Sequence, residues 1–129
     1  MFCHDKLTVY KKAVEFLGAA HSILRGLSPG NGDVNNQLRR AAMSIALNIA
    51  EGAGKTGTKD KRRFYSIARG SALECAALLD LCTEWHLVDQ SLIIEARTIL
   101  EQIAAMLGKL CANSYQGTGS GAVPVPGSG

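Results

Sequence analysis

Residues 37–52 read QLRRAAMSIALNIAEG, and the order of apolar and polar side chains in and just before this stretch decides the fold. One apolar set recurs every three or four residues, which is the period of a helix packed against a core. This set consists of Val34, Leu38, Ala41, Ile45 and Ile49. The stretch therefore predicts an amphipathic α-helix over residues 33–51, with Asp33 as its N-cap.

The same helix has a second apolar side, which a polar line separates from the first. The second side consists of Met43, Ala46, Leu47 and Ala50, and the polar line of Gln37, Arg40, Ser44, Asn48 and Glu51. A helix that is apolar on two sides is buried on both, so the second side is expected to meet another copy of the chain. The predicted oligomer interface comprises Met43, Leu47 and Ala50, with Ser44, Asn48 and Glu51 hydrogen-bonded beside them. The alternative is an exposed surface of alanine and methionine, which small side chains make tolerable.

Three further amphipathic helices are predicted around this one. No proline interrupts residues 30–123, and glycines cluster at 26–32, at 52–57 and from 117 onward, where helices are expected to end. The helix over residues 5–27 is predicted to bury Leu7, Tyr10, Val14, Leu17, His21 and Leu24. The helix over residues 59–85 is predicted to bury Phe64, Ile67, Ala68, Ser71, Cys75, Leu78, Cys82 and Trp85. The last helix, capped by Asp89, is predicted to bury Leu92, Ala96, Ile99, Ile103, Met106 and Leu110.

Four helices with short connections and no alternating strand pattern predict an all-α fold, an antiparallel up-and-down four-helix bundle. The bundle is expected over residues 1–113, and residues 114–129, rich in Gly, Ser and Pro, are expected to form a flexible tail. The hydrophobic content of 47% excludes a disordered chain. Because no apolar run could cross a bilayer and the first residues do not form a signal peptide, we expect a cytoplasmic protein with its four cysteines as thiols.

The formal net charge of +3 hides an uneven distribution along the chain. Residues 39–69 hold eight basic and two acidic side chains, whereas residues 70–129 hold two basic and six acidic ones. A concentrated basic zone is typical of a surface that attracts a phosphate backbone. The candidate nucleic-acid-binding residues are Lys55, Lys59, Lys61, Arg62, Arg63 and Arg69, with Arg39 and Arg40 contributing if they are not held at the oligomer interface. The alternative is that these side chains only keep a helix and a loop in solution.

The sequence offers no convincing catalytic, cofactor or metal site. Residues 52–57 fit the glycine pattern of dinucleotide-binding loops, but those loops follow a strand, so a glycine-rich helix end is the better interpretation. Cys75, Cys82 and His86 could form part of a metal site, yet the two thiols fall on the core stripe, where small thiols are common. His21 is interpreted as a hydrogen-bonded core histidine, and Glu51 and Glu74 as partly buried, salt-bridged carboxylates. We therefore expect no enzyme, no cofactor and no metal.

Residues 37–52 also resemble a family of four-helix-bundle proteins encoded in intervening sequences of bacterial large-subunit ribosomal RNA genes. The resemblance covers about residues 5–113, beginning at residues 7–13 and continuing through residues 64–71 and Glu74. Tyr10 stands where the family often has Trp, and Ala46 where Pro is frequent. The resemblance implies a small cytosolic bundle that assembles as a ring-like homopentamer. The chain is similar, more distantly, to the accessory protein of diversity-generating retroelements, which implies binding of RNA and of a reverse transcriptase.

Together these features predict a non-catalytic, oligomeric protein that binds RNA or DNA through the basic zone. Because few aromatic residues lie near the zone, binding is expected to be electrostatic and weakly sequence-specific. The alternative is a protein-interaction adaptor that docks a reverse transcriptase or a ribosome-associated partner through its acidic half or the rim of the ring.

Overall fold

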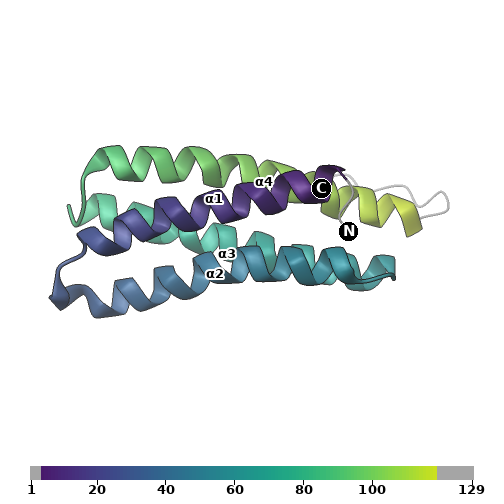
Figure 1. Cartoon of the computed structure of the whole chain (residues 1–129), viewed down its shortest axis with the longest axis horizontal. Coiled ribbons are helices and arrows are strands. Elements are labelled where there is room, and N and C mark those ends of the chain that lie inside the picture. Colours follow the sequence, from purple (N-terminus) through teal and green to yellow (C-terminus); the bar gives the residue numbers. More distant parts are fainter. Residues whose placement is uncertain (1–3, 119–129) are drawn as a thin grey trace.

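The computed structural model describes the backbone of residues 4–118 and the side chains of residues 6–112, and over this range it forms four long helices (Figure 1). Helix α1 comprises His4–Gly26 and is followed by a short 3-10 turn, η1, at Pro29–Asn31. The other helices are α2 (Gly32–Gly54), α3 (Thr58–Glu84) and α4 (Gln90–Thr118). The described chain contains no strand, so the predicted all-α fold is confirmed.

The helices form a square in which each one packs against its neighbours in the chain. Contacts join α1 to α2, α2 to α3, α3 to α4 and α4 back to α1, whereas the described parts of the diagonal pairs make none. Neighbouring helices run in opposite directions, so the α2–α3 loop lies at the same end as the start of α1 and the end of α4 (Figure 1). This arrangement is the predicted up-and-down four-helix bundle.

The core consists of apolar side chains contributed by all four helices. The fully buried residues among the described ones include the large side chains of Phe16 and Tyr65, and no polar or charged residue among them is buried. All five residues predicted to form the core stripe of α2 are buried. In α4, Ala96, Ile99, Ile103 and Leu110 are buried, while Leu92 and Met106 are partly buried against them.

The predicted core stripe of α1 is wrong, because this helix has two adjacent apolar stripes. The buried residues of α1 are Val9, Ala13, Phe16, Ala20, Ile23 and Leu24, and only Leu24 belongs to the predicted set. Leu7, Val14 and His21 are exposed, while Tyr10 and Leu17 are partly buried. His21 is therefore a surface residue rather than a core histidine. The predicted stripe lies instead on the flank of α1 that adjoins α2, where Tyr10, Val14 and Leu17 line a groove with residues of α2.

The predicted stripe of α3 is half right for the same reason. Ala68, Cys75 and Cys82 are buried as predicted, together with Tyr65, Ala72 and Leu79. Ile67 and Trp85 are instead 44% and 62% exposed, and Phe64, Ser71 and Leu78 are partly buried. Helix α3 therefore has an outer apolar stripe beside its core stripe.

Two predicted boundaries also change. Helix α2 continues through Gly54, and within its last turn the absence of a side chain at Gly52 allows the Tyr65 ring of α3 to pack directly on the helix backbone. Helix α4 continues to Thr118 and so includes the first five residues of the predicted tail, whose remainder lies outside the described residues. No helix in the described range is both long enough and apolar enough to cross a membrane.

Candidate nucleic-acid interface and oligomer interface

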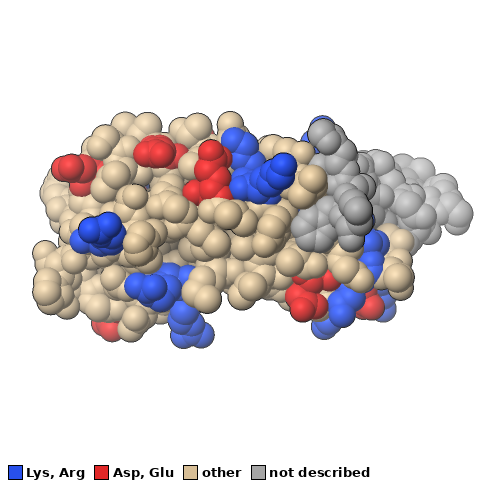
Figure 2. Space-filling view, in the orientation of Figure 1, with Lys and Arg blue, Asp and Glu red and all other residues tan. Residues whose placement is uncertain are grey.

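Five of the eight candidate cations lie at one end of the bundle. Lys55 follows the last residue of α2, and Lys59, Lys61, Arg62 and Arg63 occupy the first turns of α3. We call these five residues the basic end. Lys59 and Arg63 are exposed, and the other three side chains are partly exposed. Figure 2 shows blue side chains gathered with a few red ones at the lower right of the molecule.

Phe64 organises two of these cations. The Lys55 Nζ lies 5.3 Å, and the Arg63 Cζ 4.7 Å, from the centre of the Phe64 ring. The Lys55 Nζ also lies 3.7 Å from the Glu51 Oε2, in an exposed ion pair. Each exposed cation–π contact stabilises by about 0.5–1 kcal/mol. The ring therefore holds both cations near the α2–α3 loop and is itself occupied by them.

The remaining three candidate cations are not part of the basic end. Arg69 lies eleven residues into α3, about 17 Å along the helix axis from its start, at 1.5 Å per residue. Arg39 and Arg40 lie near the middle of α2, about 22 Å from the α2–α3 loop on the same measure. All three side chains are exposed. The structure thus separates the predicted site into one cluster and three outlying residues.

The whole bundle is divided in charge along its length. The half that contains the α2–α3 loop comprises residues 4–15, 44–71 and 104–118, with ten Lys and Arg and four Asp and Glu. The other half, residues 16–43 and 72–103, has four Lys and Arg and seven Asp and Glu. The formal charges are therefore +6 and −3. The contrast present in the sequence becomes a contrast between the two ends of one molecule.

A polar groove lies between α2 and α3. Hydrogen bonds at this groove engage Ser44 and Asn48, two of the residues predicted for the oligomer interface. The groove has a volume of about 260 Å³ and is lined by Gln37, Arg40, Ala41, Ser44, Ser71 and Glu74. The Ser71 Oγ donates a hydrogen bond to the Ser44 Oγ over 2.7 Å, and the Asn48 Nδ2 donates to the Ser44 Oγ over 3.0 Å. Ser44 and Asn48 thus already bond within the chain.

The two carboxylates predicted to be partly buried are at the surface. Glu74 is exposed, and the Glu51 side chain is 60% exposed beside Lys55. In the single chain, neither carboxylate therefore requires a buried partner.

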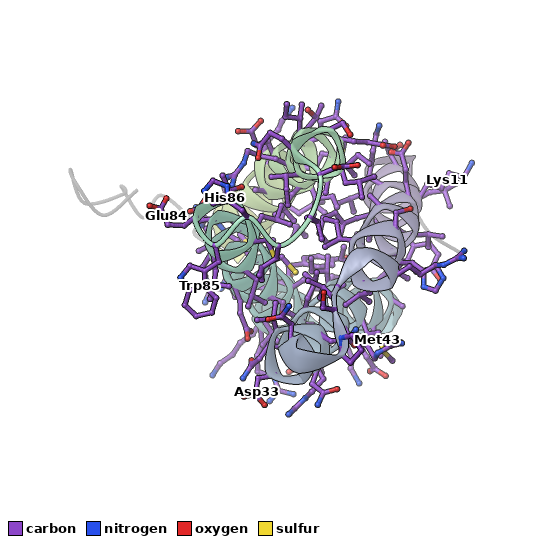
Figure 3. All side chains as sticks on the ribbon, turned by 90° about the vertical axis from the view of Figure 1, so that its left-hand side faces the viewer. Lys11, Asp33, Met43, Glu84, Trp85 and His86 are labelled. Carbon is purple, nitrogen blue, oxygen red and sulfur yellow. The ribbon has the colours of Figure 1, made fainter. Side chains whose placement is uncertain are left out.

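The second apolar side of α2 forms one wall of a groove whose other wall is α1. This apolar groove has a volume of about 190 Å³ and is lined by Tyr10, Val14, Leu17, Met43, Ala46, Leu47 and Ala50. Leu47 is 60% exposed, and Figure 3 shows Met43 directed away from the bundle interior on the α1 side. The α1 residues were missed from sequence because their stripe was interpreted as core. The signal was present in the two adjacent apolar stripes of that helix.

The described residues show no group of three His, Cys, Asp or Glu side chains able to hold a metal ion. Burial raises the pKa of the Cys75 thiol to about 12, with a smaller contribution from the charge of Glu74, and burial also raises the pKa of Cys82. Both thiols are therefore protonated core residues. His86 lies apart from them, exposed after the end of α3. The glycine-rich segment follows a helix, and the Lys55 N–H donates to the Gly52 carbonyl, which confirms a helix C-terminus there.

Comparisons with known proteins agree with this architecture. Among solved structures, a protein of unknown function from the S23 ribosomal protein family of Bacteroides thetaiotaomicron has the same fold, with a TM-score of 0.77 at 19% identity. The match covers 84% of this chain and 98% of that one. A search of curated proteins finds no match. Residues 5–109 match the family described as 23S rRNA-intervening sequence protein, and since this match spans most of the described bundle, the chain belongs to that family.

Proposed function

We propose that this protein is a non-catalytic, oligomeric RNA-binding protein of the cytoplasm that contacts the phosphate backbone through the basic end. The observation that carries the proposal is the convergence of Lys55, Lys59, Lys61, Arg62 and Arg63 at one end of a bundle whose surrounding half is formally +6. Side chains of this kind, close together and partly or fully exposed, neutralise phosphates and release counterions.

Binding through this surface is electrostatic and weakly sequence-specific. Of the two aromatic residues at the start of α3, Tyr65 is buried in the core and Phe64 already carries Lys55 and Arg63. Because Tyr65 is buried and Phe64 is engaged by two cations, contacts with phosphates dominate over base stacking. Phosphate contacts position a protein on a nucleic acid without reading its sequence.

Assembly increases the affinity of such a surface. The apolar groove favours self-association, and the ring of five copies that the family resemblance implies would present five basic ends to one RNA. Modest contacts from each copy then act together, because the later contacts form at a high effective concentration.

The test is a salt titration of binding to a fluorescent single-stranded RNA oligonucleotide. Wild type is compared with a variant carrying Lys59→Ala, Lys61→Ala, Arg62→Ala and Arg63→Ala. If each lost cation removes one phosphate contact, the slope of log K against log salt becomes less steep by about 3. A matched control removes the four cations of the acidic half, through Arg25→Ala, Arg39→Ala, Arg40→Ala and Arg97→Ala, and should retain most of the affinity and slope.

Two outcomes would contradict the proposal. One is wild-type protein that does not bind RNA, and the other is a basic-end variant that binds as wild type does while the control also remains unchanged. Either result would favour the adaptor function, with the acidic half or the ring rim docking a reverse transcriptase or a ribosome-associated protein.

A further inference from the structure

The end of the bundle opposite the basic end is acidic on one side only. Residues 72–103, which run from the second half of α3 into the first half of α4, hold six Asp and Glu and one Arg, a formal charge of −5. Residues 16–43, which belong to α1 and α2, hold three Arg and one Asp, a formal charge of +2. Red side chains accordingly lie along the upper left of Figure 2, where α4 begins. The negative charge of this half therefore belongs to its α3–α4 side.

The register of α3 against α4 places Glu84 at the level of Ile94. Asp80 of α3 forms an ion pair with Arg97 of α4. Glu84 follows Asp80 by one helical turn and Ile94 precedes Arg97 by one turn, which in antiparallel helices is the same direction along the bundle. Ile94 is 59% exposed. A carboxylate and an exposed aliphatic side chain therefore lie on the two sides of the α3–α4 seam.

Trp85 lies on the other side of Glu84 and is 62% exposed at the end of α3. The Leu87 N–H donates a hydrogen bond to the Cys82 carbonyl over 2.9 Å and so fixes this helix end. The bond closes around His86, whose φ of 52° is in the left-handed region that glycine usually adopts after a helix. Figure 3 shows Glu84, Trp85 and His86 directed outward from one corner of the bundle. The indole is thus exposed on a fixed helix end, with Glu84 between it and Ile94.

The carboxylates near these residues lack cationic partners in the described chain. Glu84, Asp89 and Glu95 are exposed and form no ion pair with a described residue. Arg97, the one cation of residues 72–103, is paired with Asp80. We call the surface formed by five of these residues the acidic corner: Glu84, Trp85, Asp89, Ile94 and Glu95.

The aromatic residue of the acidic corner is also without a cation. At the basic end the Phe64 ring carries two cations of its own chain, whereas no described cation lies over the Trp85 ring. An aromatic ring, a carboxylate and an aliphatic side chain exposed side by side are the groups that recognise a cationic protein segment.

We infer that the acidic corner binds a segment of another protein in which an arginine stands between two apolar residues. The planar guanidinium pairs with Glu84 through two hydrogen bonds, and the apolar side chains cover Trp85 and Ile94. In an extended segment the arginine and the residues two positions before and after it share one face, about 7 Å apart. The charge of −5 attracts such a segment and repels nucleic acid.

This surface is separate from the one proposed for RNA. Lys59 and Glu84 lie twenty-five residues apart in α3, about 37 Å along the helix axis. The protein can therefore hold an RNA at one end and a cationic protein segment at the other.

The fluorescence of Trp85 tests the inference directly, because this is the one tryptophan of the chain. The probe is the peptide acetyl-Leu-Ser-Arg-Ser-Leu-amide, which has the required pattern. Its addition should shift the emission of Trp85 to shorter wavelength and reach saturation, since the ring is taken out of water. The rearranged peptide acetyl-Ser-Leu-Arg-Leu-Ser-amide has the same composition and charge but places its leucines on the opposite face, and it should bind about fivefold more weakly.

Variants separate a built site from a general attraction of charge. Glu84→Gln and Ile94→Ser should each weaken peptide binding by about fivefold. Glu101→Gln is the matched control for charge, at an exposed carboxylate of the same acidic segment about 10 Å along α4 from Ile94. Leu73→Ser is the matched control for apolar area, at a position 62% exposed and about 16 Å along α3 from Glu84. Both controls should bind as wild type does, and circular dichroism should show all four variants folded.

Three results would overturn the inference. They are an emission of Trp85 that does not respond to the peptide, equal losses in Glu84→Gln and Glu101→Gln, or an emission that shifts with protein concentration alone. The second would leave only attraction by the overall charge, and the third would place a second copy of the chain over the acidic corner. The variant that lacks four cations of the basic end should bind the peptide no more weakly than wild type does, so a failure of RNA binding and a failure of this inference are separate results.

Discussion

The backbone of Gly52 packs so closely against the ring of Tyr65 that a Cβ at residue 52 would lie 2.7 Å from the Tyr65 Cε1. The same Cβ would lie 3.2 Å from the Cβ of Phe64, the residue whose ring holds Lys55 and Arg63. Gly52 is thus the point at which the end of α2 and the start of α3 approach most closely. Because the missing side chain sets this approach, it also sets where the basic end lies.

Gly52→Ala should therefore destabilise the protein. The added methyl group must displace a fully buried aromatic ring, and overpacking of this kind costs about 1–3 kcal/mol. Gly18→Ala and Gly70→Ala are the controls, since a Cβ at either helical position meets nothing within 4 Å. Each should stabilise by about 0.5–1 kcal/mol, the usual gain for alanine in a helix. Urea unfolding measures all three, and a stable Gly52→Ala protein would show that Tyr65 can move aside.

The bond between Ser71 and Ser44 makes a separate prediction for the middle of the bundle. Ser71→Ala should lower the free energy of unfolding by about 1 kcal/mol, the net value of one such hydrogen bond, and Ser44→Ala should lower it by more, because the Ser44 Oγ also accepts from the Asn48 Nδ2. The double variant should lose less than the sum, because both single changes remove the same bond. Strict additivity in a urea double-mutant cycle would show that the two hydroxyls act independently.

Cys75 predicts a loss of stability at high pH. Burial, with a smaller contribution from Glu74, raises the pKa of this thiol from 9.0 to about 12 in the folded protein. Because the folded-state pKa is the higher one, the contribution of Cys75 is complete below pH 9 and is lost as the pH rises toward 12. Between these values the free energy of unfolding of wild type should fall more steeply than that of Cys75→Ala. Parallel slopes in urea titrations at each pH would contradict this account.

The ion pair between Asp80 of α3 and Arg97 of α4 is expected to contribute little. Asp80 is 71% exposed, and exposed pairs stabilise by about 0–1 kcal/mol. Asp80→Asn should lower the free energy of unfolding by less than about 1 kcal/mol, and 1 M salt should remove the difference, because the Debye length then falls to about 3 Å. A larger loss that persists in salt would mean that this pair does more than bridge two surface helices.

The sequence predicts the helices well because glycines and prolines confine them and each has an apolar stripe. It predicts the core stripe of α2 correctly, since Gln37, Ser44 and Asn48 separate the two apolar sides of that helix. In α1 no polar line separates Val14 from Ala13 or Leu17 from Phe16, so periodicity alone could not decide which stripe was core. The outer stripe contains large apolar side chains such as Tyr10 and Leu17, whereas the buried stripe combines Phe16 and Ile23 with the small Ala13 and Ala20.

The candidate site was predictable only in part. Consecutive cations such as Lys61, Arg62 and Arg63 necessarily lie together, whereas the distance of Arg39 and Arg40 from them follows from the length of α2. The bond of Ser44 to Ser71 depends on which side of α3 faces α2, and no pattern within either helix specifies that. Only the α2 wall of the apolar groove could be predicted from the sequence of that helix. The other wall belongs to α1, and no pattern within α2 specifies which side of α1 adjoins it.

The division of charge along the bundle makes the molecule an electric dipole directed along its long axis. In the field of a polyanion such a body experiences a torque as well as an attraction, so it rotates its α2–α3 end forward before any contact forms. The encounter is thereby oriented while the molecules are still separated by solvent. The end that bears Trp85 then points away from the polyanion, facing whatever else is in solution.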